Sequence, residues 1–169
     1  MHSDLTTVLA TLRYRLQTRL QAAGIEVVWE VSALPPMPQL SPQSVLQVQR
    51  ILLEAFTNVL KHARATRVTM RAEWRDGDPP AVELQLADDG CGAPIEPAAG
   101  AARGHGVPNM QARAGAIGAT LRIESMSGRG TCVRLVWPIL ALSPTVDTGV
   151  GSARDAIDES GGVKTAHDS

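Results

Sequence analysis

The sequence predicts a single mixed α/β domain, of the α+β type, with about three helices. Two observations predict this class. Apolar residues recur at helical spacing in three segments, while other segments alternate polar and apolar residues between glycine-rich turns. The chain has 169 residues, of which 44% are hydrophobic and only 3% aromatic, so its core must consist mainly of aliphatic side chains.

Helix and strand boundaries follow from capping and turn residues. Gly24 stops the first helix, Ser41 and Pro42 suit the cap and first turn of the second, and Gly118 ends the third. The helices are expected over residues 5–20, 42–63 and 107–117. The strands are expected over residues 25–31, 67–74, 81–87, 119–124 and 131–137.

Two segments carry no regular spacing. Residues 93–103 are expected to form a mobile loop, and the composition shift after Pro144 predicts a disordered tail. The expected organisation is therefore an N-terminal helix over residues 1–23, a main domain over 24–140 and a disordered tail over 141–169.

The bulk composition excludes several classes of protein. The chain has 16 basic and 17 acidic residues and a net charge of −1, so nothing argues for a nucleic-acid or membrane-surface partner. No apolar run reaches the roughly eighteen residues that cross a bilayer, and no signal peptide is expected. The two cysteines, Cys91 and Cys132, form no disulfide framework and fit a reducing cytoplasm.

Glu54, Asn58 and Lys61 share one helical stripe, with His62 at its edge. Taken alone, such a polar stripe is better explained by an ordinary solvated helix face. The functional interpretation depends on the uncharged Asn58, whose amide oxygen suits Mg²⁺, an ion that takes its other ligands from water and phosphates. Lys61 could neutralise phosphate oxygens, and Glu54 could accept a proton from an attacking group.

Asp88 ends a predicted strand and is followed by Gly90 and Gly92. A carboxylate in that position could accept a hydrogen bond from an exocyclic amine such as that of adenine. The alternative is a plain turn at the end of a strand, because Asp-Gly pairs are common there.

Two further glycine segments also have two interpretations, and for each of them the plain structural one is favoured when the segment is taken alone. Gly104, His105 and Gly106 open a helix whose free N–H groups would favour a phosphate, or they form a flexible loop end in which His105 is exposed. Residues 128–131, which include Gly130 and Thr131, could form only a hairpin turn.

In their order, these blocks resemble the ATP-binding catalytic domain of bacterial sensor histidine kinases, in the superfamily that includes DNA gyrase, Hsp90 and MutL. Residues 53–63 look like its N box, and residues 88–92, 104–106 and 128–131 look like its three glycine boxes. Glu54, followed by Lys61 and His62, is similar to the nitrate-sensor subfamily. The likeness covers roughly residues 25–138.

For the N box, the resemblance implies ATP and Mg²⁺ as ligands. Asn58 would hold Mg²⁺, and Lys61 would lie near the phosphates, with His62 among the nucleotide-binding residues. Glu54 would be the candidate general base, so that Glu54, Asn58 and Lys61 would be the catalytic residues.

For the glycine boxes, the resemblance implies that Asp88 binds the adenine amine. Gly90 and Gly92 would shape the adenine pocket, and Thr131, next to Gly130, would support Asp88 through a water molecule.

The second glycine box would lie at the phosphates. Gly104 and Gly106 would flank them with His105 nearby, under a lid formed by residues 93–103. The implied fold is a two-layer α/β sandwich, with a mixed sheet on one side, helices on the other and the nucleotide between helices and lid.

One departure concerns the phosphate acceptor. Kinases of this family phosphorylate a histidine on a separate helical dimerisation domain, but no His-Asp or His-Glu pair precedes the N box here, and His2 lies too close to the start. Residues 1–23 could be the end of such a domain. The chain therefore resembles a catalytic domain cut from a longer kinase, or a protein that acts on a partner's histidine. We expect it in the cytoplasm, by itself or as the cytoplasmic part of a membrane-bound sensor, with a histidine-bearing dimerisation domain as its partner and a response regulator downstream.

Two alternatives remain at this point. One is a serine kinase of the anti-sigma-factor type on the same fold, and the other is a regulatory domain that binds nucleotide without chemistry. The intact N-box and glycine-box residues count against the second. Glu54 with Lys61 and His62 favours the histidine kinase over the first.

Overall fold

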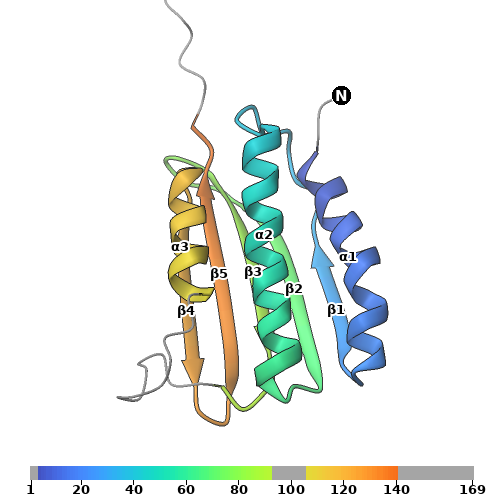
Figure 1. The fold of residues 1–169 in the computed structure, drawn as a ribbon. Helices are drawn as coiled ribbons and strands as arrows, with labels where there is room; N and C mark the ends of the chain where they lie inside the picture. Colours follow the sequence, from blue (N-terminus) through green and yellow to red (C-terminus); the bar gives the residue numbers. More distant parts are fainter. Residues whose placement is uncertain (1–3, 93–105, 141–169) are drawn as a thin grey trace, which may run out of the picture.

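A computed structural model describes residues 4–92 and 106–140 as one β-sheet with a layer of helices (Figure 1). The helical elements are α1 (Leu5–Ala22), α2 (Pro42–Asn58), the π-helix η1 (Val59–Ala63) and α3 (Gly106–Ala116). The strands are β1 (Glu26–Val31), β2 (Arg67–Arg75), β3 (Ala81–Asp88), β4 (Thr120–Met126) and β5 (Gly130–Pro138). The predicted two-layer α/β sandwich is confirmed.

The sheet is mixed and has the strand order β1-β2-β3-β5-β4. β1 runs parallel to β2, and the other neighbouring pairs are antiparallel. A parallel neighbour requires a crossover, which the connector after β1 and helix α2 provide. The end of β3 therefore lies beside the start of β2 on one side, where Asp88 is opposite Val68, and beside the start of β5 on the other.

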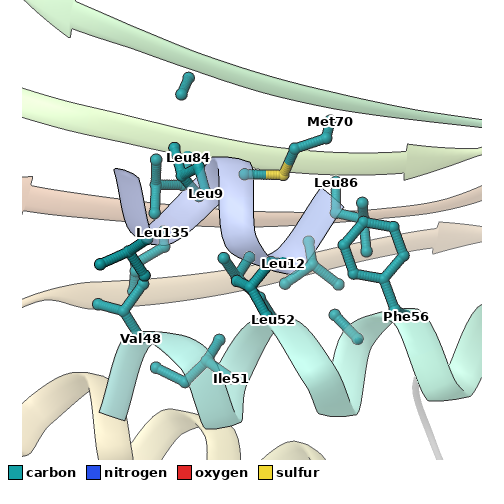
Figure 2. Packing of buried hydrophobic residues seen from close by; sticks show 14 of the residues in the cluster. Leu9, Leu12, Val48, Ile51, Leu52, Phe56, Met70, Leu84, Leu86 and Leu135 are labelled. Carbon is teal, nitrogen blue, oxygen red and sulfur yellow. The ribbon is translucent and has the colours of Figure 1, made fainter. Parts of the chain in front are cut away.

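The helices cover one face of this sheet, and the core fills the space between the two layers (Figures 1 and 2). Phe56, the only phenylalanine, lies in α2 with its ring centroid 6.0 Å from that of Trp29 on β1. The remaining core is mainly aliphatic, as the composition predicts. Buried members from both layers include Leu9, Leu12, Val48, Ile51, Leu52, Met70, Leu84, Leu86 and Leu135.

Helix α1 is part of the same core. Its buried residues recur every three or four positions, and they belong to one cluster with residues of α2 and the sheet. They are Leu5, Val8, Leu9, Leu12, Leu16 and Leu20. The expected boundary at residue 24 thus crosses a continuous core, because α1 covers apolar surface that the sheet domain would otherwise expose. Its connection to a dimerisation domain stays a prediction.

The opposite face of the sheet carries charged side chains. The Glu83 carboxylate, on β3, is 7% exposed because it lies between the guanidinium groups of Arg75 and Arg134, at 3.0 and 3.3 Å. Arg67 and Arg71 of β2 pair with glutamates of β1 on this face. The two faces therefore alternate along each strand, which fixes the strand register.

The predicted boundaries agree with the observed ones to within two residues, with one exception. Ser41 caps α2 through a reciprocal pair of hydrogen bonds with Ser44, and Pro42 is in the first turn, as expected. The helix expected to continue to Ala63, however, changes from α to π after Asn58 and ends at Arg64 in a left-handed conformation. A single wide turn has no periodicity of its own, so apolar spacing could not predict it.

The expected loop over residues 93–103 and the expected tail over 141–169 lie outside the described residues. None of the helices in the described part of the chain is long and apolar enough to cross a membrane.

Candidate functional site

Four segments meet at one end of the two layers. They are the C-terminal end of α2, the end of β3 and the turn between β4 and β5, at the lower end of Figure 1, and the start of α3, which lies higher in the view beside α2. These are the segments in which sequence reasoning placed the site residues. Antiparallel pairing of β3 with β5 and the direction of α2 bring them together.

Helix α2 supplies the polar side chains of this end. Glu54 and Asn58 are half-buried and lie one turn apart, so they share a face, as predicted. Lys61 is exposed and lies within η1, where the wider turn moves it from the regular stripe. The side chain of His62 lies outside the described residues.

Asp88 lies half-buried at the end of β3. Its Oδ1 accepts a hydrogen bond of 2.9 Å from the backbone N–H of Gly90. Burial raises the pKa of the Asp88 carboxyl above its usual value, while the backbone N–H groups of Gly90 and Thr131 act in the opposite direction. A carboxylate kept partly from water is suited to accept a strong hydrogen bond from a ligand.

Asp89 was not singled out from the sequence, yet its carboxylate is the more heavily hydrogen-bonded of the pair. It accepts from the backbone N–H groups of Thr66 and Arg67, both at 2.8 Å, and from the Thr66 hydroxyl at 2.6 Å. These bonds join the end of β3 to the start of β2. The hydroxyl bond is the main cause that lowers the pKa of Asp89. From two adjacent aspartates, the sequence does not show which carboxylate forms hydrogen bonds within the protein.

The first and third glycine segments pack backbone against backbone. A Cβ at Gly130 would lie 2.9 Å from the carbonyl carbon of Asp88, and one at Gly92 would lie 2.8 Å from that of Met126. Both glycines also have positive φ, of 84° and 63°. Gly128 donates a hydrogen bond of 2.6 Å to the carbonyl of Cys91. We call this contact between residues 88–92 and 126–130 the backbone junction.

Thr131 follows Gly130 in β5 and lies beside the backbone junction. Its hydroxyl lies 2.9 Å from that of Ser125 on β4, and its backbone N–H offsets part of the rise in the pKa of Asp88 that burial causes. The expected support of Asp88 by Thr131 through a water molecule stays a prediction.

The second glycine segment meets helix α2. Gly106 begins α3, and a Cβ at this position would lie 2.8 Å from Oε1 of Glu54. We call this contact between Glu54 and Gly106 the helix junction. Gly104 and His105 lie outside the described residues, so their predicted places at the phosphates are not tested.

The side-chain oxygen atoms at this end suit a hard cation that takes its remaining ligands from phosphates and water. The Asn58 side chain makes no helix-capping hydrogen bond, and the Glu54 carboxylate lies one turn before it. Within residues 4–92 and 106–140, there is no group of three or more His, Cys, Asp or Glu that could hold a metal. One or two oxygen ligands from the protein, with water and phosphates completing the shell, match the usual coordination of Mg²⁺.

The comparisons with known proteins agree with this geometry. Residues 43–141, more than half of the chain, match the family described as histidine kinase-, DNA gyrase B- and HSP90-like ATPase. The chain belongs to this family. It is an ATP-binding ATPase domain, homologous to those of two-component sensor kinases.

Named relatives support the same assignment. A sensor protein NarQ homolog of Haemophilus influenzae is 30% identical over 152 residues, which are 81% of this chain and 25% of the relative. UhpB, a signal transduction histidine-protein kinase/phosphatase of Salmonella typhimurium, is 28% identical over 134 residues, with 78% and 25% covered. The chain thus spans about a quarter of the length of these relatives.

Solved structures show the same fold. Full-length ShkA, in complex with AMPPNP, superposes with a TM-score of 0.66 at 23% identity, over 82% of this chain and 30% of that one. The mycobacterial sensor histidine kinase MprB gives a TM-score of 0.61 at 22% identity, over 80% and 96%.

Proposed function

We propose that this ATPase domain transfers the γ-phosphate of ATP to a histidine on a separate helical domain of a two-component sensor kinase. The names of its relatives support this reaction. The structural observation that supports the proposal is the close approach of Gly106 to Glu54, one helical turn before Asn58, in a fold that places the end of β3 with Asp88 at the same end as the end of α2 (Figure 1). The comparisons do not favour the serine-kinase alternative.

The proposed roles follow from the chemistry of each group. The half-buried Asp88 carboxylate accepts a hydrogen bond from the adenine amine, which sets the nucleotide at the backbone junction. Asn58 holds Mg²⁺, and Lys61 adds a positive charge near the phosphates. Mg²⁺, when bound, neutralises charge on the phosphate oxygens.

The proposed transfer exchanges one bond to phosphorus for another. An imidazole nitrogen of the acceptor histidine bonds to the γ-phosphorus while the bond to the bridging oxygen breaks, and ADP leaves with that oxygen. The imidazole loses its remaining N–H proton to a base or to water. Glu54 is the proposed base, since it is the carboxylate on the same helical face as Asn58.

The proposed partners are a histidine-bearing dimerisation domain, in the same kinase or supplied in trans, and a response regulator that receives the phosphate. The proposed location is the cytoplasm, where ATP is available.

Phosphate transfer tests the proposal. The chain is incubated with labelled Mg-ATP, alone and with a histidine-bearing dimerisation domain from a sensor kinase of the same subfamily. We expect no label on the chain alone and an acid-labile label on the added domain. Asn58→Ala should abolish the transfer by weakening the Mg²⁺ site. Gln43→Ala, at the exposed opposite end of α2, is the matched control and should transfer at the parental rate.

Two results would contradict the proposal. An acid-stable label on serine would indicate the serine-kinase alternative. An acid-labile label on the isolated chain, lost on changing His2, would place the acceptor within this chain.

A further inference from the structure

The helix junction joins the N box to the second glycine segment through one contact. A Cβ at Gly106 would lie 2.8 Å from Oε1 of Glu54, closer than a Cβ normally approaches another atom, and 3.6 Å from its Cδ, an ordinary contact distance. Gly106 is half-buried, and Glu54 is also half-buried. The carboxylate therefore occupies the space that any other residue at position 106 would fill.

The position of α3 on α2 is fixed by other contacts. Met110 and Ala114, one and two turns after Gly106, are each 1% exposed and lie on the same helical face. Two turns along α3 from Gly106, Arg113 donates a hydrogen bond of 3.1 Å to Gln47, which lies two turns before Glu54. The helices run in opposite directions (Figure 1), so these contacts and the helix junction share one register. These contacts hold α3 on α2 from one turn beyond Gly106 onward.

The two partners differ in how easily they can move. The atom nearest to Gly106 is the end of a flexible side chain, whereas α3 is held by buried contacts. An added Cβ would therefore displace the carboxylate and leave the helix in place. We propose that Gly106 is a positioning residue for Glu54: the absence of its side chain sets where the Glu54 carboxylate lies beside Asn58.

This role differs from the one that the resemblance implies for Gly106, which is close approach of its backbone to the phosphates. The inference rests on the proposed function, since the position of Glu54 matters for transfer only if Glu54 takes part in it. It predicts a defect in transfer rather than in ATP binding, because the adenine contact at Asp88 belongs to the backbone junction.

A double-mutant cycle at positions 54 and 106 tests the proposal. The variants are Gly106→Ala, Glu54→Asp and the combination of both, because the aspartate side chain is shorter by one methylene and leaves room for a Cβ. Gly115→Ala is the matched control: it lies in the same helix, and a Cβ there would meet nothing within 4 Å. For each variant of the 169-residue chain, the dissociation constant of Mg-ATP and the transfer rate to the added histidine domain are measured.

Gly106→Ala should bind Mg-ATP within about twofold of the parent but transfer phosphate about tenfold more slowly. Gly115→Ala should leave both values unchanged. In the Glu54→Asp background, adding Gly106→Ala should slow transfer by less than about twofold. Equal losses of rate in both backgrounds would overturn the proposal, since the two residues would then act independently.

A second measurement follows the position of the Glu54 carboxylate and does not depend on phosphate transfer. The side-chain carboxyl ¹³C resonance of Glu54 should move in Gly106→Ala and stay unchanged in Gly115→Ala, without nucleotide present. If the parent transfers no phosphate, the proposed function fails. The shift of this resonance still shows whether Gly106 sets the position of the Glu54 carboxylate. A Glu54 resonance that is the same in both variants would contradict the positioning role.

Discussion

The backbone junction and the helix junction use glycine for different physical reasons. At the backbone junction, Gly92 and Gly130 have positive φ and face carbonyl groups that cannot move independently of the fold. At the helix junction, Gly106 faces the end of a flexible glutamate. Glycines of the three glycine boxes thus meet two different structural requirements. Gly92 and Gly130 allow the close contact between residues 88–92 and 126–130, while Gly106 sets the position of the Glu54 carboxylate.

The largest effect expected from this difference is on stability at the backbone junction. Gly130→Ala combines a left-handed backbone with a collision against Asp88, so it should lower the free energy of unfolding by about 3 kcal/mol or more. Gly128→Ala is the control, because its φ is 77° but a Cβ would meet nothing within 4 Å; it should cost about 1 kcal/mol. Denaturant titration of both variants measures this. Equal losses would show that backbone conformation alone, and not the contact, requires glycine.

The next effect is on nucleotide affinity. Asp88→Asn removes the acceptor's charge and should weaken Mg-ATP binding by about ten- to a hundredfold, since a charge-assisted hydrogen bond contributes about 1.5–3 kcal/mol. Asp89→Asn is the neighbouring control and should bind with the parental affinity, because its carboxylate is committed to Thr66 and Arg67. Calorimetric titration separates the two. Parental affinity in Asp88→Asn would make Asp88 a turn residue only.

A smaller effect is expected on stability at Asp89. Replacing its carboxylate by an amide weakens three hydrogen bonds that hold the end of β3 to the start of β2. Because the group is exposed, the loss should be about 1 kcal/mol. Thermal unfolding of Asp89→Asn at neutral pH measures it. A melting temperature equal to that of the parent would show that water replaces these bonds without cost.

The smallest effect is the dependence of stability on pH, where the two aspartates act in opposite directions. The pKa of Asp89 is lowered by folding, so its stabilisation is present above the ordinary value of 3.8 and is lost as pH falls through the lowered pKa. The pKa of Asp88 is raised, so its contribution to the free energy of unfolding declines as pH rises from 3.8 through the raised value. Unfolding between pH 2 and 7 should therefore lose part of its acid dependence in Asp89→Asn and become more acid-sensitive in Asp88→Asn. Matching profiles for both variants would contradict these opposite shifts.

Most of the fold could be predicted from the sequence because its signals are local. The cap at Ser41 and Pro42, the stop at Gly24 and the alternation along the strands each depend on a few neighbouring residues. The strand order and the packing of α1 into the core could not be predicted in this way, since they depend on contacts between distant segments.

The sequence predicts which types of residue lie in the candidate site. It does not predict which of them form contacts within the protein and which are left to bind a ligand. The order of the blocks predicts Asp88 and Asn58 as site residues, yet nothing in the sequence distinguishes the half-buried Asp88 from the exposed, hydrogen-bonded Asp89. The π-turn that moves Lys61 and the contact of Gly106 with Glu54 appear only when segments are placed in space.

Mapping of Mg-ATP binding by amide NMR tests most directly whether one nucleotide connects the two junctions. On titration into the full chain, amide resonances should shift both at residues 88–92 and 130–131 and at Glu54, Asn58 and Gly106, with one common dissociation constant. The resonances of β1 and of the start of α2 should stay in place. Shifts at only one junction, or two different dissociation constants, would contradict a single nucleotide site between them.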